Sequence, residues 1–378
     1  MSALRVNPDP ENSSAPSLLV GSMAPFLVAI LLLGVSSLAT GANFNQVFQW
    51  DELDYEWPSE AHRTQALENG SFKPENILPL YIAVHGTRLF LSLHKENGIP
   101  ATLVSLPTSS PTSASPKLTP FPSWDMHLNG TGNCSKIRFV EGLQVDSVGR
   151  LWVLNLESSD CNTTLLIFNL NTNEIELIHR FPSSEPINDF VIDETANGTF
   201  AYISRSGGQR IVVFSLERNQ SWTVDTPGIE ESSAALSLKK EQLYLGNMDS
   251  KELFSIPVTA LRNGSRTSNP ELIGKWTGKP YKMLTDNHGK LYVTFDRENY
   301  ISTWITSQPF QEQRFHEVAG LNFSWPFTLA LDKNGTLWVT VFDQNRKPRY
   351  RLLKDADQAT SVEDSPGCSS LCRKKDAA

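Results

Sequence analysis

Residues 139–155 read FVEGLQVDSVGRLWVLN, in which two segments of alternating apolar residues flank a short turn from Asp146 to Gly149. Alternation with a period of two is typical of a half-buried β-strand, and a turn of Asp and Gly between two such strands indicates a β-hairpin. The pattern returns almost unchanged at 283–294 (MLTDNHGKLYVT) and at 329–340 (LALDKNGTLWVT). This hairpin is therefore the unit of an internal repeat.

Three weaker copies complete the series, at 81–91, 190–203 and 235–245. Neighbouring copies lie about 45 residues apart, and a strand-rich period of roughly this length is typical of a β-propeller with one four-stranded blade per repeat. The first interval is longer because it contains a Ser/Pro-rich surface loop at 107–116. One blade cannot bury both of its faces, so the copies stack around a ring. The sequence predicts an all-β fold, a six-bladed β-propeller.

The two ends of the repeat region complement each other. Residues 44–51 (FNQVFQWD) read as a strand that belongs to no complete repeat, whereas the last repeat has only three strands. Pairing the first strand into the last blade would remove both exposed edges. We therefore expect a propeller over 42–354 that is closed by an N-terminal strand in the last blade, followed by a polar, disordered tail at 355–378.

Residues 1–41 have the character of a secretory signal peptide with a polar leader. The apolar core at 26–35 has about ten residues, well short of the roughly 20 that span a bilayer. Small residues follow at 39–41, and Met23 is an alternative start because the residues before it are polar. We expect a secreted, extracellular protein that has no membrane attachment after signal removal.

Charge, cysteines and sequons agree with that compartment. The net charge of −8 disfavours nucleic acids and anionic membranes as partners, because both attract clustered Lys and Arg. Cys134 and Cys161 flank strands of the second blade and are predicted to form a disulfide, whereas Cys368 and Cys372 pair with each other or stay free. No His lies at ligand spacing from a Cys, so no metal site is predicted there. The expected glycosylation sites are Asn69, Asn129, Asn133, Asn162, Asn197, Asn219, Asn263, Asn322 and Asn334.

Five motifs, one of them within the repeated hairpin, resemble the yellow and major royal jelly protein family. They are WDELDYEWPS at 50–59, FKPENILP at 72–79, GIPATL at 98–103, SPKLTPFPSW at 115–124 and GRLWVL at 149–154. The resemblance runs from Phe48 to Phe342 and implies a secreted six-bladed propeller. Members of the family act in pigmentation, convert dopachrome-type intermediates, bind biogenic amines or serve as nutritive glycoproteins. Thr328 and Phe342 are carried over from the family's amine pocket by position.

The mouth of the central channel is the expected ligand site. The residue five positions before the turn Asp of each repeat starts the inner strand, and this count selects Glu141, Asn188, Tyr281 and Phe327. Blade four contributes Ser232 or Ser233, and blade one a residue near Pro79. A carboxylate beside aromatic faces suits a cationic aromatic amine or a catechol. A water-filled channel without a ligand is the structural alternative.

A divalent cation site is the other alternative. Glu141, Asn188 and Asp189 resemble part of the calcium hub of six-bladed lactonases, which uses hard oxygen ligands. A further Asp is needed from blade four, where Ser232 and Ser233 stand. No cofactor is therefore expected, with calcium as the candidate ion if there is one.

The sequence thus predicts a secreted yellow-like glycoprotein that binds a small aromatic ligand and converts dopachrome if it is an enzyme. In that case Glu141 is the expected proton acceptor, because a partly buried carboxylate has a raised pKa. The alternatives are a structural or nutritive glycoprotein and a lactonase-like hydrolase.

Overall fold

The computed structural model describes residues 44–110, 115–127, 136–156, 162–182, 187–205, 208–229, 231–237, 241–247, 250–296, 298–317, 328–343 and 347–356. The chain divides into two compact units, 1–40 and 41–378, and all described residues lie in the second. Several predicted features lie outside the described residues: the signal peptide with Met23, the chain after 356, Cys134, Cys161, Cys368, Cys372, Asn129, Asn133, Asn322 and Phe327.

The described strands form six four-stranded antiparallel sheets, so the predicted six-bladed propeller is confirmed. The first five sheets each take four consecutive strands. These are β2 (Pro79–His85), β3 (Arg88–Leu93), β4 (Leu103–Pro107) and β5 (Thr119–Pro120); β6 (Phe139–Val145), β7 (Arg150–Leu156), β8 (Thr164–Asn169) and β9 (Glu174–Arg180); β10 (Ile187–Thr195), β11 (Gly198–Arg205), β12 (Arg210–Ser215) and β13 (Gln220–Asp225); β14 (Glu231–Ser237), β15 (Gln242–Asn247), β16 (Glu252–Pro257) and β17 (Glu271–Lys275); β18 (Pro280–Thr285), β19 (Lys290–Phe295), β20 (Tyr300–Ile305) and β21 (Gln313–Glu317).

The sixth sheet combines the two ends of the described chain. It consists of β1 (Phe44–Trp50), β24 (Tyr350–Asp355), β23 (Leu337–Phe342) and β22 (Thr328–Leu331), in that order. The register of β1 on β24 runs from Phe44 opposite Asp355 to Trp50 opposite Tyr350. The strand predicted at 44–51 is therefore present and pairs with the last described strand. Because Asp355 belongs to this ladder, the sheet extends one residue beyond the predicted end of the propeller at 354.

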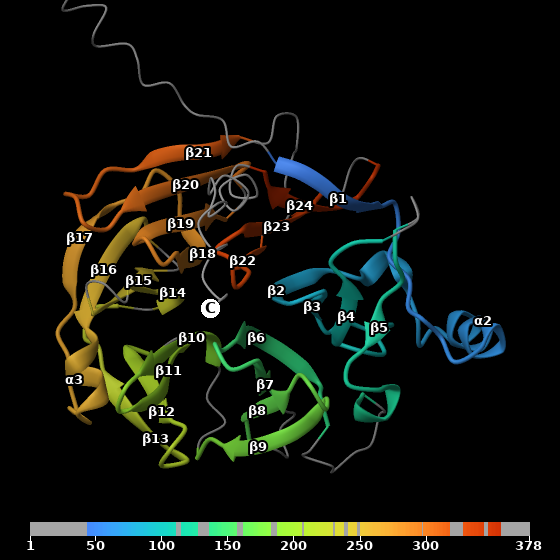
Figure 1. Cartoon of the computed structure of the whole chain (residues 1–378), viewed down its shortest axis with the longest axis horizontal. Coiled ribbons are helices and arrows are strands. Elements are labelled where there is room, and N and C mark those ends of the chain that lie inside the picture. Colours follow the sequence, from blue (N-terminus) through green and yellow to red (C-terminus); the bar gives the residue numbers. More distant parts are fainter. Residues whose placement is uncertain are drawn as a thin grey trace, which may run out of the picture. The chain divides into compact units, whose positions relative to one another are not determined.

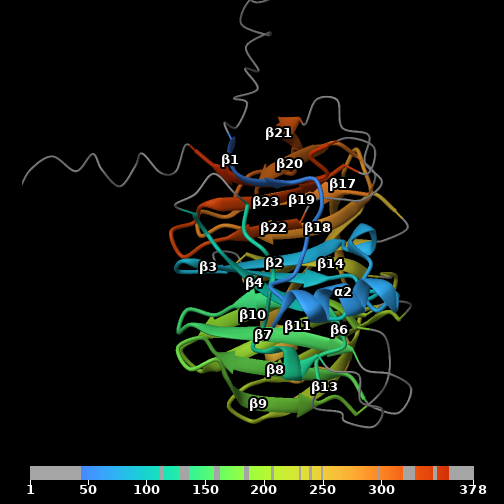
Figure 2. The same cartoon turned by 90° about the vertical axis from the view of Figure 1, so that its right-hand side faces the viewer.

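The six inner strands surround the centre of the ring (Figure 1). Each inner strand contacts the inner strands of the two neighbouring sheets, in the cyclic order β2, β6, β10, β14, β18, β22 and back to β2. Among the described residues, two short α-helices, α2 (Glu60–Glu68) and α3 (Val258–Arg262), and two 3-10 turns, Pro74–Asn76 and Trp124–Met126, lie in the connections. Figure 2 shows the side that carries α2.

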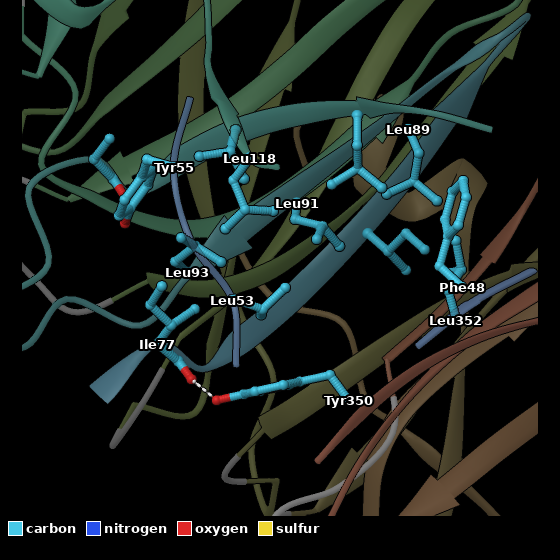
Figure 3. Packing of buried hydrophobic residues seen from close by; sticks show 14 of the residues in the cluster. Phe48, Leu53, Tyr55, Ile77, Leu89, Leu91, Leu93, Leu118, Tyr350 and Leu352 are labelled. Atoms are coloured by element: carbon cyan, nitrogen blue, oxygen red, sulfur yellow. Dashed lines mark hydrogen bonds between the residues drawn. The ribbon is translucent and has the colours of Figure 1, made fainter. Parts of the chain in front are cut away.

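A shared apolar layer joins the first sheet to the sixth. Phe48 of β1 and Leu352 of β24 pack with Leu89 and Leu91 of β3 (Figure 3). In the same layer the Tyr350 hydroxyl donates a hydrogen bond of 2.5 Å to the backbone carbonyl of Ile77. Burial of this apolar area stabilises the contact between the first and sixth sheets.

The repeated turn has a specific hydrogen-bond pattern. The Asp146 carboxylate accepts from the Arg150 backbone N–H at 2.8 Å, the Arg150 Nε at 2.6 Å and the Trp152 indole N–H at 2.8 Å. Gly149 has a φ of 87°, a left-handed conformation that favours glycine. The Asp, the Gly and the aromatic residue six positions after the Asp therefore fix one hairpin.

Two further copies repeat this pattern. Asp332 accepts from the Thr336 N–H at 3.0 Å and from the Trp338 indole at 3.1 Å. Asp286 accepts from the Lys290 N–H at 2.8 Å and, more weakly, from the Tyr292 hydroxyl at 3.5 Å. The sequence repeat is thus a repeat of turn chemistry as well as of strand pattern.

Candidate functional site

Five inner strands share one irregularity close to their first residue. In β2, β6, β10, β14 and β18 the pairing with the next strand shifts register, so the inner strand carries a β-bulge. A bulge changes the direction in which the side chain points. The residues at these shifts are Leu80, Glu141, Asn188 with Asp189, Ser232 and Tyr281.

The residues selected by counting five positions back from the turn Asp are therefore the bulged residues. Glu141, Asn188 and Tyr281 all stand at a register shift, as does Ser232 on β14. In the first sheet the bulged residue is Leu80, because Pro79 still pairs with Leu93. The side chain of Ser232 lies outside the described part of the structure.

Lys282 of β18 contacts residues of two sheets that are not its neighbours. Its Nζ lies 3.5 Å from Oδ2 of Asp189 on β10 and 3.4 Å from the centre of the Tyr81 ring on β2. The Tyr281 ring centre lies 5.2 Å from the same nitrogen. Neither β2 nor β10 neighbours β18 in the cyclic order of inner strands. These side chains therefore meet across the centre of the ring.

Tyr81 makes a second contact across the ring. Its hydroxyl donates a hydrogen bond of 2.9 Å to the backbone carbonyl of Asn188 on β10, two sheets away. Burial raises the pKa of Tyr81, and the charges of Asp189 and Glu141 add to the increase. The phenol is thus held neutral, with its ring face against the Lys282 ammonium.

The charged groups at the centre shift each other's protonation. Burial raises the pKa of Glu141; the Lys282 ammonium opposes this, and the Asp189 carboxylate adds to it. Burial also raises the pKa of Asp189, again opposed by Lys282. The pKa of Lys282 falls because burial outweighs the attraction of both carboxylates. We call Tyr81, Glu141, Asp189, Tyr281 and Lys282 the channel cluster.

Burial together with the carboxylates Glu141 and Asp189 raises the pKa of Tyr281, so this phenol also stays neutral. Two buried hydroxyl groups lie on the remaining inner strands. Ser233 Oγ on β14 and Thr328 Oγ1 on β22 are buried and have no hydrogen-bond partner among the described residues. A small polar ligand or water would satisfy them.

Phe342 lies apart from these contacts. Its ring stacks on Tyr350 at 5.0 Å with an interplanar angle of 29°, and it lines an apolar cavity with Trp50 and Leu352 between the first and sixth sheets. A ligand role for Phe342 stays a prediction based on family position alone.

The sequence analysis did not single out Tyr81 or Lys282, although Tyr81 follows the bulged Leu80 and Lys282 follows the bulged Tyr281. The available signal was a charged or aromatic residue directly after three of the bulged positions, at Tyr81, Asp189 and Lys282.

The described residues contain no group of three or more His, Cys, Asp or Glu side chains that could hold a metal ion. Lys282 already places a positive charge beside Asp189, which disfavours a divalent cation at this point of the cluster. The calcium hypothesis gains no support from these contacts.

A second concave surface lies beside α2. This groove of about 870 Å³ is lined by Trp57, Trp124, Lys95 and Asn69, among others. The two indole rings stack at 4.9 Å, and both indole N–H groups are used, by Asp54 and by the Glu56 carbonyl. The groove is therefore lined by both aromatic and polar side chains.

The fold and the channel cluster define a six-bladed β-propeller with a charged, aromatic-lined centre. The family model described as major royal jelly protein matches residues 140–238 and 230–354, more than half of the sequence. The chain belongs to the major royal jelly protein family.

Curated relatives agree with this assignment, and a solved structure shares the fold. Protein yellow of Drosophila guanche is 26% identical over 393 residues, covering 89% of this chain and 68% of the relative. Protein yellow of Drosophila melanogaster is 26% identical over 384 residues, covering 88% and 69%. A chain from the crystal structure of a nidogen/laminin complex superposes with a TM-score of 0.50 at 12% identity, covering 72% of this chain and 98% of that chain, and shows similarity of fold alone.

Proposed function

We propose that this protein is a secreted, glycosylated member of the family that binds a small aromatic ligand, a biogenic amine or a catechol, at the channel cluster. The observation that carries the proposal is the position of the Lys282 ammonium, 3.4 Å from the centre of the Tyr81 ring and 3.5 Å from Asp189. The centre of the ring thus already accommodates an ammonium group between an aromatic face and a carboxylate. Such sites attract cations through charge pairing and cation–π interaction.

The Glu141 carboxylate favours the binding of a second ammonium group, which the ligand would supply. Lys282 pairs with Asp189, and no ion pair within 4.0 Å is made by Glu141 among the described side chains. Glu141 and the Tyr281 face together provide a carboxylate and an aromatic ring for a ligand. A catechol would instead donate hydrogen bonds to the same carboxylate.

Exposed sequons support the proposed glycosylation. The six sequon asparagines in the described part of the chain are all exposed: Asn69, Asn162, Asn197, Asn219, Asn263 and Asn334. None of the helices in that part has the length and apolar character needed to span a bilayer. Exposed asparagines are the positions at which a bulky glycan is tolerated.

Calorimetric titration with dopamine, serotonin and neutral catechol tests the binding proposal. We expect Glu141→Gln to weaken the binding of the two amines by about 1.5–3 kcal/mol, the range for a hydrogen bond to a charged group. The binding of catechol should change less. Tyr281→Ala should weaken all three ligands. Glu174→Gln is the matched control, because Glu174 is exposed on β9, the outer strand of the same sheet.

The outcomes separate the competing functions. Absence of heat with every ligand would favour a structural or nutritive glycoprotein. Binding that depends on added calcium would favour the cation site. Amine binding that is unchanged by Glu141→Gln would refute the placement of the ligand in the channel cluster.

A second candidate function is dopachrome conversion, which the raised pKa of Glu141 favours. The conversion moves a proton from carbon to oxygen without net oxidation, and a carboxylate whose pKa lies nearer neutrality is a better proton acceptor and donor. Spectrophotometric loss of dopachrome, compared between the wild type and Glu141→Gln, tests this. Equal rates in both proteins would exclude Glu141 as the proton acceptor.

A further inference from the structure

Lys282 is a buried amine whose surroundings come almost entirely from other sheets. Its side chain is 10% exposed. Its Nζ contacts the Asp189 carboxylate of β10 and the Tyr81 ring of β2, and the charge of Glu141 on β6 attracts it. A lysine that served only to pair with Asp189 would need neither of the aromatic rings at 3.4 and 5.2 Å. The setting provides a nucleophile, a proton donor and a flat binding surface within one cluster.

We propose that Lys282 captures aromatic aldehydes as an imine at the centre of the ring. The inference rests on the proposed function, because it uses the same cluster, but it assigns a covalent chemistry that ligand binding does not require. Amines of this kind react with carbonyl compounds when they are desolvated. Burial lowers the pKa of Lys282, which increases the fraction of neutral amine at a given pH.

The step balances without any oxidant or reductant. The Nζ lone pair attacks the carbonyl carbon, and the carbonyl π electrons move to oxygen. A proton then transfers from the nitrogen to that oxygen, which gives a carbinolamine. Glu141, whose pKa burial raises, donates a proton to the hydroxyl oxygen, which leaves as water. The C=N bond forms as the C–O bond breaks, and Asp189 stabilises the protonated imine. One neutral amine, one aldehyde and the proton of Glu141 therefore give one protonated imine, one water and the Glu141 carboxylate.

The rings determine which aldehydes react well. The centres of the Tyr81 and Tyr281 rings lie 3.4 and 5.2 Å from Lys282 Nζ. A group bonded to this nitrogen therefore lies near both rings. Flat aromatic groups gain stacking contacts there that a saturated ring of similar size does not. The expected substrate class is an aryl aldehyde.

Lys290 provides a control within the same protein. Its Nζ also lies near aromatic rings, 4.4 Å from Phe315 and 5.1 Å from Tyr292, and burial lowers its pKa as well. It is located at the turn-side end of β19 and is not part of the channel cluster. A reaction that depended only on a lowered amine pKa would modify both lysines.

The test is reductive trapping on the full chain. The protein is incubated with 4-hydroxybenzaldehyde and sodium cyanoborohydride at neutral pH, and peptide mapping locates the hydroxybenzyl groups. We expect labelling of Lys282 to be at least about tenfold faster than labelling of Lys290, and Glu141→Gln to slow it by about tenfold or more through loss of the proton donor. Cyclohexanecarbaldehyde should label Lys282 more slowly than the aryl aldehyde.

Lys282→Arg keeps the positive charge and should remove the preferred adduct. The wild-type comparison of Lys282 with Lys290 decides the matter even if this variant does not fold. Labelling without preference for Lys282, or none at Lys282, would overturn the proposal. Amine binding by calorimetry without Lys282 labelling refutes only the imine, whereas Lys282 labelling without amine binding refutes only the proposed amine site.

Discussion

Replacing Asp146 with alanine removes the acceptor of three hydrogen bonds in the turn between β6 and β7. Two come from Arg150, at 2.8 and 2.6 Å, and one from the indole of Trp152 at 2.8 Å. The Asp146 side chain has no exposed surface, and Trp152 is fully buried. The variant would leave the indole N–H without its acceptor inside the protein.

The magnitude follows from these contacts. A hydrogen bond to a charged acceptor contributes about 1.5–3 kcal/mol, and a buried donor that loses its partner costs about 1–3 kcal/mol. Arg150 is 22% exposed and regains water in the variant, so its two bonds contribute at the lower end. We expect Asp146→Ala to lower the free energy of unfolding by about 3–5 kcal/mol.

Urea unfolding of four variants checks this reasoning. Trp152→Phe removes the indole donor, and the double variant with Asp146→Ala measures the coupling between the two side chains, expected at about 1–2 kcal/mol. Asp225→Ala is the control, because its ion pair with Arg210 is 54% and 53% exposed and should contribute less than about 1 kcal/mol. An Asp146→Ala protein within 1 kcal/mol (about the size of one ordinary hydrogen bond) of the wild type would refute the role of the turn carboxylate.

Three further predictions concern stability. Deleting residues 44–51 removes the partner of β24 and buried Phe48, so we expect a loss of several kcal/mol and aggregation; an unchanged melting temperature would contradict this. Burial lowers the pKa of His127 from 6.5 to about 4, so the unfolded chain takes up the proton first. Stability should therefore fall by up to roughly 3 kcal/mol between about pH 6.5 and 4, a slope that His127→Gln should remove in urea unfolding at a series of pH values. Non-reducing peptide mapping should link Cys134 to Cys161, whose loop of about 27 residues would contribute roughly 3 kcal/mol; free thiols at both would exclude the bridge.

The hairpins were predictable because their causes are local. Asp146, Gly149 and Trp152 lie within seven consecutive positions. The Asp146 carboxylate accepts the Trp152 indole N–H, and Gly149 adopts the left-handed turn conformation, so the local sequence is enough to predict the hairpin. The number of sheets followed from counting this unit. The pairing of 44–51 with the last repeat required one further argument, that an incomplete sheet needs a fourth strand.

The channel positions were predictable for a related reason. The distance from bulge to turn is the same in several repeats, so counting back from the turn Asp led to Glu141, Asn188 and Tyr281. Strict alternation then implies that the next residue points away from the centre. The bulge breaks that alternation, which is why Lys282 and Tyr81 reach the centre although the count did not include them.

The contacts of Lys282 depend on residues far away in sequence. Asp189 and Tyr81 lie about 90 and 200 positions before it, and no spacing rule connects residues that meet across a ring. The stacking of Phe342 on Tyr350 is likewise a packing result between two strands of the sixth sheet. The ligand role of Phe342 stays a prediction from family position, and its described contacts belong to the apolar layer between the first and sixth sheets.

The channel cluster and the ring depend on each other. The contacts of Lys282 with Asp189 and Tyr81 connect β18 to β10 and β2, none of which are neighbours, so they exist only while all the intervening sheets keep their places. Conversely, a buried ammonium that lost either partner would be costly, which favours the arrangement in which the sheets surround it. A ligand that bridges the same groups would bind the assembled ring and not the unfolded chain, and so would stabilise it by about 2.7 kcal/mol at a hundredfold excess over its Kd. Loss of β1 should therefore weaken ligand binding as well as stability, although β1 contributes no residue to the cluster.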